Sequence, residues 1–97
     1  MIASFRTTGT ADVFHGRDTK SARRTCPSEL WRVAIRKLEY LDGAGALGDL
    51  RAPPANRLEA LRGDRAGAYS IRINEQYRIC FRWTETGPAE VEIVDYH

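Results

Sequence analysis

The sequence is poor in cysteine, and its two cysteines, Cys26 and Cys80, lie far apart. They form no C-x-x-C pair, and a small secreted scaffold usually carries several disulfides, although a single bond between the two remains open. Neither His15 nor His97 lies near them in the sequence, so no zinc ligand set is expected. This pattern favours a reduced, cytoplasmic protein without a metal or another cofactor.

Long hydrophobic runs are absent as well. No stretch approaches the ~18 consecutive apolar residues of a membrane-spanning helix. The opening, Met1–Arg6, becomes polar within a few residues, unlike a secretory signal. Hydrophobic residues make up 42% and charged residues 29% of the 97 positions, which fits neither a disordered chain nor a membrane protein. We expect one domain over residues 1–97, with a two-layer core and no deep cofactor cavity.

Net charge is small, at +2, but the basic residues are unevenly distributed between the two types. Only Lys20 and Lys37 are lysines, so thirteen of the fifteen basic residues are arginines. The planar arginine fork suits phosphate groups and stacks on bases. The codon bias of a GC-rich genome would give the same count, so composition permits nucleic-acid binding without demonstrating it.

The clearest helical pattern covers residues 28–41. Ser28 follows a proline and is a good N-cap, and Glu29 complements the helix dipole. Leucine and alanine then recur at helical spacing until Gly43 ends the pattern. Before this helix, residues 1–5 are expected to form an edge strand, and residues 10–24 either a short helix or a loop.

Beyond Pro54 the hydrophobic period changes to two. Residues 69–73, 77–83 and 91–93 alternate apolar and polar side chains, with short turns between them. Strands joined by short turns pair antiparallel. The expected fold is therefore α+β, a small antiparallel sheet covered on its apolar face by the N-terminal helices. The opposite face would carry exposed arginines: Arg72, Arg78 and Arg82.

Three features of this stranded half suggest chemistry. Arg78 lies in the middle of a strand, where its guanidinium would be held rigidly and could clamp a phosphate. Residues 57–67 pack several charges around two glycines, although a solvated hairpin loop would be the better account of this segment taken alone. The chain closes on Asp95, Tyr96 and His97, three groups able to transfer protons or form hydrogen bonds.

Four stretches of the sequence resemble a known family: residues 57–67, 69–74, 77–81 and 94–97. They resemble HigB-type toxins of the RelE superfamily, which belong to bacterial type II toxin–antitoxin modules, and they are most similar to the GraT-like branch. The likeness extends over most of the chain. It is strongest over residues 54–97 and weak over residues 7–27.

The resemblance implies helices on one face of an antiparallel sheet, and a metal-independent endoribonuclease. Such a toxin enters the ribosomal A site and cleaves mRNA during translation. The implied partner is a HigA-type antitoxin with a helix-turn-helix motif, and operator DNA would be bound only through the toxin–antitoxin complex. No membrane partner is implied.

Carried over by position, the resemblance implies six catalytic residues: Glu59, Arg62, Arg78, Asp95, Tyr96 and His97. The two arginines would stabilise charge on the phosphate, and His97 would be the general acid. Many HigB toxins have a histidine where this chain has Glu59, so the base or orienting group remains open between Glu59 and Asp95. Tyr96 would stack on a base or hydrogen-bond the substrate.

Four further arginines would position the protein against ribosomal RNA: Arg57, Arg65, Arg23 and Arg24. An ordinary solvated surface position would explain each of these four arginines as well. Replacing Arg78 by alanine should abolish toxicity and cost no more than ~1 kcal/mol of stability if the site is exposed.

Two other classes of function compete with the nuclease. The same fold occurs in toxins that poison DNA gyrase by protein contact, and degenerate copies can persist as inactive binding proteins. A small nucleic-acid-binding regulator without catalysis would need only the arginines. The residues matching catalytic positions favour the nuclease.

Overall fold

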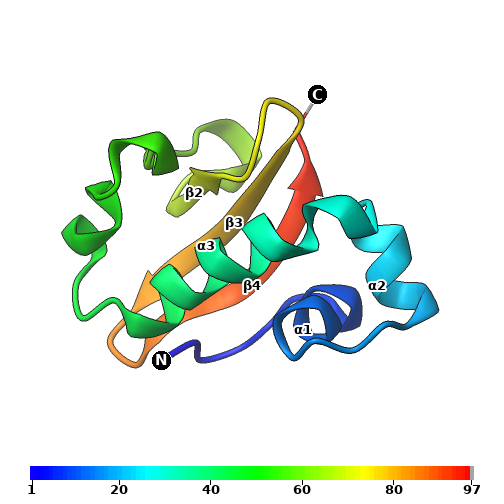
Figure 1. The fold of residues 1–97 in the computed structure, drawn as a ribbon. Helices are drawn as coiled ribbons and strands as arrows, with labels where there is room; N and C mark the ends of the chain where they lie inside the picture. The colour runs from blue at the N-terminus through cyan, green and yellow to red at the C-terminus, as the bar shows by residue number, and fades with distance from the viewer. Residues whose placement is uncertain (97) are drawn as a thin grey trace.

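The computed structural model describes residues 1–96, with the helices first and the strands last (Figure 1). The α-helices of this part are α1 (Thr8–Phe14), α2 (Lys20–Thr25) and α3 (Trp31–Gly43). Single 3-10 turns lie between the larger elements: η1 (Ser28–Leu30), η2 (Leu47–Arg51), η3 (Pro54–Asn56) and η4 (Gly63–Arg65). The strands are β1 (Glu59–Ala60), β2 (Ala68–Arg72), β3 (Tyr77–Thr84) and β4 (Gly87–Asp95).

The strands form one antiparallel sheet in the order β1-β2-β3-β4. The turn between β2 and β3 is fixed by Asn74, whose Oδ1 accepts hydrogen bonds from the backbone N–H groups of Gln76 and Tyr77 at 2.9 and 2.7 Å. Local side-chain bonding of this kind is what makes asparagine a turn former. The predicted α+β fold and antiparallel meander are confirmed.

The region before α3 is helical, which decides between the two structures expected for residues 10–24. The hydroxyl of Thr7 caps α1, and that of Thr19 caps α2 by accepting a hydrogen bond from Ala22 N at 3.0 Å. Gly9 lets the two helices touch, because a Cβ there would collide with the Thr25 hydroxyl.

The main helix begins later than predicted. Residues Ser28–Leu30 form η1, and α3 starts at Trp31 with no side-chain cap bond at either N-terminus. Ser28 is therefore not an N-cap. The helix does end at Gly43, as the glycine pattern predicted.

The expected edge strand at residues 1–5 does not form. This segment runs beside β4 with a single parallel bridge between Phe5 and Val91. Backbone hydrogen bonds hold it there, including Ala3 N to the Pro88 carbonyl at 2.7 Å. The segment therefore lies along the β4 edge without joining the antiparallel ladder.

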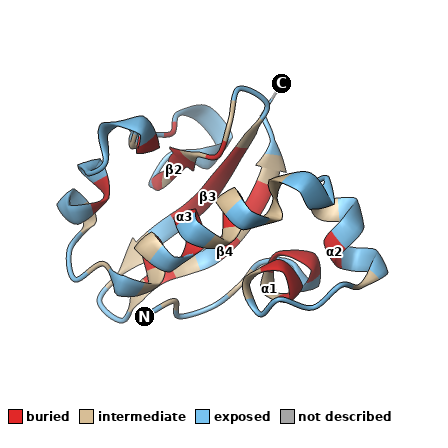
Figure 2. Ribbon diagram, viewed as in Figure 1, coloured by how far each residue is buried: buried red, intermediate tan, exposed pale blue. Residues whose placement is uncertain are grey.

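The principal core lies between the helices and the sheet. Leu38 and Leu41 of α3 pack with strand residues such as Ile71, Ile79 and Phe81, all of them buried. Buried residues follow β3 and β4 directly behind α3 (Figure 2). Because burying one such side chain contributes roughly 1.5–3 kcal/mol, this face supplies most of the hydrophobic stabilisation. No helix within residues 1–96 has the length and apolarity needed to cross a membrane.

The opposite face of the sheet is not simply solvated, contrary to expectation. Residues 57–67, which we call the covering segment, include β1 and fold back over this face. Leu61 of this segment packs against Ala68, Cys80 and Val94 in a second, small core. This second core places the candidate site residues of the covering segment against the strands.

Candidate functional site

Arg78 projects from β3 beneath the covering segment, held at both sides of its guanidinium. Its Nε donates to Ser70 Oγ at 2.8 Å, and one terminal nitrogen donates to the Arg57 carbonyl oxygen at 2.7 Å. Strand register explains the first bond, because Arg78 lies opposite Arg72 and therefore diagonally across from Ser70. The rigid placement predicted for this arginine is present.

Arg78 is buried and not exposed, which corrects the expectation about its surroundings. Only 8% of the residue is accessible to solvent. An aliphatic or small replacement would leave the Ser70 hydroxyl and the Arg57 carbonyl without this donor, and unmet buried polar groups are costly. The premise that this site is exposed is therefore wrong, and we expect the loss of Arg78 to cost more stability than an exposed site would.

Glu59 and Tyr96 flank Arg78. A carboxylate oxygen of Glu59 lies 3.8 Å from a terminal nitrogen of the guanidinium, and the Tyr96 ring lies over the guanidinium with its centroid 5.6 Å away. β1 places Glu59 through its pairing opposite Ser70. The cross-strand pairing thus brings a carboxylate, a guanidinium and an aromatic ring together.

An open hollow of about 680 Å³ lies on this cluster. Its lining includes Glu59, Arg62 and Tyr96. A second hollow of about 330 Å³ is lined by Arg65, Val94, Asp95 and Tyr96. Tyr96 therefore lines both hollows, and each of them is bordered by an arginine and a carboxylate.

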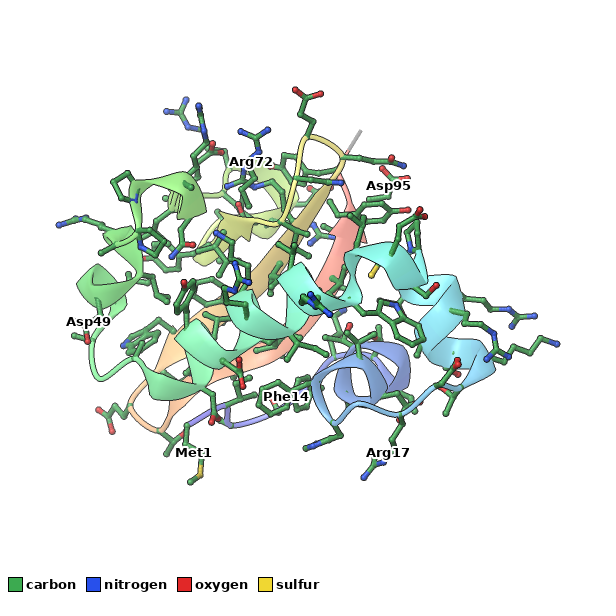
Figure 3. The ribbon with its side chains drawn as sticks, in the orientation of Figure 1. Met1, Phe14, Arg17, Asp49, Arg72 and Asp95 are labelled. Carbon is green, nitrogen blue, oxygen red and sulfur yellow. The ribbon has the colours of Figure 1, made fainter. Side chains whose placement is uncertain are left out.

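The turn between β2 and β3 is bonded to Asp95 and Tyr96. Tyr96 N donates to the Gln76 carbonyl at 2.7 Å, and Gln76 Nε2 donates to Asp95 Oδ2 at 3.0 Å. Burial, and after it the charge of Asp95, raises the pKa of the Tyr77 hydroxyl. Figure 3 shows Asp95 at the same end of the molecule as Arg72, the last residue of β2. His97 lies outside the described residues.

The four arginines predicted to contact RNA do not share one surface environment. Arg65 borders the second hollow and lies 3.5 Å from a Glu92 oxygen. Arg23 and Arg24 are exposed on α2, which packs against α1. Arg57 lines a different pocket, described below.

Sequence reasoning missed the groups that hold the site in place. Ser70, Gln76 and the Arg57 carbonyl were not singled out, although each is bonded to a candidate residue. Ser70 could have been found from the predicted meander, because the position of the turn fixes the register. The Arg57 carbonyl had no such signal, since its position depends on a left-handed backbone at φ 46°.

The thiols and metal-binding residue types offer no further site in this part of the molecule. Burial raises the pKa of Cys26 to about 11 and also raises that of Cys80, so neither thiol is activated as a nucleophile. Within residues 1–96, no group of three histidine, cysteine, aspartate or glutamate residues is arranged to hold a metal ion.

Residues 3–97 match the model of a family described as the RelE-like toxin of the type II toxin–antitoxin system HigB. The chain belongs to this family. The toxin is 50% identical over 74 residues to Toxin HigB-1 of Vibrio cholerae serotype O1, a match covering 76% of this chain and 77% of that protein. The family predicted from the sequence motifs is confirmed, while the narrower likeness to a GraT-like branch stays a prediction.

Two further relatives extend the comparison. The toxin is 44% identical over 57 residues to an uncharacterized protein of Haemophilus influenzae, across 59% of this chain and 56% of that protein. The structure titled YoeB-YefM complex from Staphylococcus aureus is similar over 100% of the toxin and 98% of that chain, with a TM-score of 0.62 and 16% identity. At that identity the likeness shows a common fold.

Proposed function

We propose that this toxin is a ribosome-dependent endoribonuclease that cleaves mRNA in the ribosomal A site and so inhibits translation. The observation that carries the proposal is the cluster beneath the hollow, where Glu59 and Tyr96 flank a buried, rigid Arg78 and Arg62 stands at the rim. Family membership supports a toxin; the cluster supports phosphate chemistry.

The proposed reaction needs no metal. A base removes the proton of an mRNA 2′-hydroxyl, and the 2′-oxygen attacks the adjacent phosphorus. The bond from phosphorus to the 5′-oxygen breaks as an acid protonates that oxygen, which leaves a cyclic phosphate and a free 5′-hydroxyl. Arg62 and Arg78 stabilise the negative charge that grows on the nonbridging oxygens.

The proton-transfer roles are proposed for three residues. His97 is the general acid, and Glu59 or Asp95 is the base or the group that orients it. The hollow supports Glu59, because this carboxylate lies at its edge and half of its side chain is exposed. Asp95 is tied to Gln76 and borders the neighbouring hollow, which fits an orienting role.

Tyr96 controls access to Arg78 in this proposal. The ring lies over the guanidinium, and the residue as a whole is 46% exposed. A substrate phosphate would therefore meet the exposed Arg62 first. It would reach Arg78 as the Tyr96 ring turns onto an RNA base, exchanging a cation–π contact for base stacking.

The proposed partners follow from the family and the charge distribution. A type II toxin has an antitoxin, which we take to be a HigA-type protein with a helix-turn-helix that also binds the operator DNA for the complex. Arg57, Arg65, Arg23 and Arg24 are proposed to orient the toxin on ribosomal RNA in the cytoplasm.

Mapping mRNA 5′ ends on translating ribosomes tests the proposal. Wild-type toxin should cut within A-site codons, and Arg62→Gln should cut about 10²-fold more slowly because it loses one charge-stabilising donor. Arg82→Gln is the matched control, since Arg82 is exposed and pairs with Glu90 outside the hollow. Intact mRNA with folded wild-type toxin would contradict the nuclease and favour a toxin acting by protein contact, such as on gyrase.

The base is assigned by a second comparison in the same assay. Glu59→Gln removes the proton acceptor while keeping the shape of the side chain. We expect it to lower cleavage by about 10²–10⁴-fold if Glu59 is the base. Full cleavage by this variant would move the role to Asp95.

A further inference from the structure

A third pocket, of about 380 Å³, lies where α3, η3 and the end of β2 meet. Four basic residues line it, and we call it the basic pocket: Arg36, Lys37, Arg57 and Arg72. The remaining lining consists of apolar residues and one asparagine, with no carboxylate. Within residues 1–96, none of the four cations forms an ion pair with an acidic side chain, although six other ion pairs occur there.

Lys37 is a buried residue among the four cations that line the basic pocket. The residue is only 8% exposed, and its Nζ donates to Asn56 Oδ1 at 2.6 Å. Asn56 is itself buried and fixed by two bonds from Nδ2 to the carbonyls of Leu50 and Ala52, both at 3.2 Å. Lys37 is therefore held in place and cannot swing out into solvent as a surface lysine does.

The cations of the basic pocket repel one another. Burial, followed by the charges of Arg36 and Arg72, lowers the pKa of Lys37. Because no carboxylate lines the pocket to offset this repulsion, a bound anion would relieve it. Arginine forks bind phosphate in a bidentate manner, so a phosphate group matches the donors better than a small spherical anion would.

The basic pocket adjoins the proposed cleavage site through two residues. Arg57 accepts a hydrogen bond from Arg78 with its carbonyl oxygen and is also one of the residues that line the basic pocket. Arg72 lies directly opposite Arg78 in the β2–β3 ladder. A strand of RNA held at Arg78 would carry its next phosphate toward the basic pocket.

We propose that the basic pocket binds a phosphate of the RNA backbone beside the scissile nucleotide. This inference rests on the proposed function, because it takes an RNA strand in the neighbouring site as its starting point. Arg36, Lys37 and Arg72 become positioning residues for RNA, and none of the three was among the RNA contacts predicted from the sequence. They hold the strand and do not touch the reacting atoms, so their loss weakens binding and leaves the chemical step intact.

Cleavage kinetics and RNA binding test the proposal with Arg36→Glu, since Arg36 is exposed and its replacement should leave the fold unchanged. Arg36→Gln is the milder second variant. Arg51→Glu is the matched control, because Arg51 is exposed, lies outside the basic pocket and changes the net charge by the same amount.

We expect Arg36→Glu to raise the KM for mRNA on ribosomes about tenfold, with kcat within about twofold of wild type, and Arg36→Gln to act in the same direction. The affinity for a short fluorescent single-stranded RNA should fall in parallel. The logarithm of the RNA binding constant should also fall less steeply with the logarithm of the salt concentration. The slope should become shallower by about 0.7, the contribution of one phosphate contact in a single strand. Arg51→Glu should match wild type in each measurement.

The outcomes separate the two proposals. If wild type cuts mRNA and both Arg36 variants keep the KM and RNA affinity of Arg51→Glu, the basic pocket does not bind RNA and the inference is overturned. If wild type fails to cut but RNA affinity still depends on Arg36, the nuclease is overturned and the RNA site stands. A titration with inorganic phosphate, followed by NMR of the arginine side chains, should perturb Arg36 and Arg72 in wild type and saturate.

Two further results would overturn the RNA assignment. The first is saturable phosphate binding with no effect of either Arg36 variant on RNA, which would mean a site for free phosphate only. The second is an Arg36 effect confined to antitoxin affinity, which would mean an acidic protein segment as the ligand.

Discussion

The two faces of the sheet are built from the same three long strands but differ in what covers them and in the side chains they bury. On the helix face, large apolar side chains from β2, β3 and β4 pack against α1 and α3, and most are fully buried. On the other face the small core consists of Leu61, Ala68 and Cys80 with Val94. The groups around it are charged, and the cover is the short covering segment.

The contrast shows where stability and function are separated in this toxin. A large dry core tolerates no charged group without a partner, so the helix face is suited to holding the fold together. The covering segment buries little apolar area, but it brings Glu59 and the Arg57 carbonyl to Arg78. The same sheet therefore offers one face for packing and one for a rigid array of charged groups.

The largest expected effect is on the helix face. Leu38→Ala should lower the free energy of unfolding by about 2–5 kcal/mol, since Leu38 is fully buried and its loss leaves a cavity. Leu61→Ala on the other face should cost less than half as much, because its core is small and lies near solvent. Urea unfolding of both variants measures the difference, and equal costs would break the contrast between the faces.

A smaller effect is expected at Arg78. Arg78→Ala should cost about 1–3 kcal/mol of unfolding free energy, because Ser70 and the Arg57 carbonyl lose a buried donor. Arg82→Ala, on the same strand but exposed and paired only with Glu90, should cost less than about 1 kcal/mol. A similar small cost at both positions would show that the Arg78 network adds little to stability.

The smallest effect concerns local opening and uses the one cysteine on each face. In single-thiol variants made by Cys26→Ser or Cys80→Ser, the thiol of Cys80 should react with a disulfide reagent about tenfold faster than that of Cys26. This corresponds to an opening that is about 1.4 kcal/mol easier under the covering segment. Both thiols are buried with raised pKa, so reaction reports opening in each case. Equal rates would mean that the faces open together.

Much of the fold was predictable because its signals are local. The alternation in β2 and β3, the Asn74 turn and the Gly43 stop of α3 all depend on neighbouring residues. Four of the site residues implied by the resemblance lie close together in the structure: Glu59, Arg62, Arg78 and Tyr96. Their catalytic roles, and that of His97, remain predictions.

The errors arose where long-range contacts decide the local structure. Residues 1–5 lie along β4 through backbone bonds to residues more than eighty positions away, which no local pattern reveals. The helix start was misplaced because Ser28 lies in a 3-10 turn. The covering segment has the composition of a polar loop, and Leu61 is the one residue of 57–67 that is buried.

The sequence by itself determined the α+β class, the division into a helical first half and a stranded second half, and the family, because periodicity, turn residues and motifs depend on neighbouring positions in the chain. Only the tertiary structure decided that Arg78 is buried, that Tyr96 lies over it and that Arg36, Lys37, Arg57 and Arg72 share one pocket. Burial and charge clustering depend on which distant segments fold together, and the hydrophobic period of one segment carries no information about its neighbours in space.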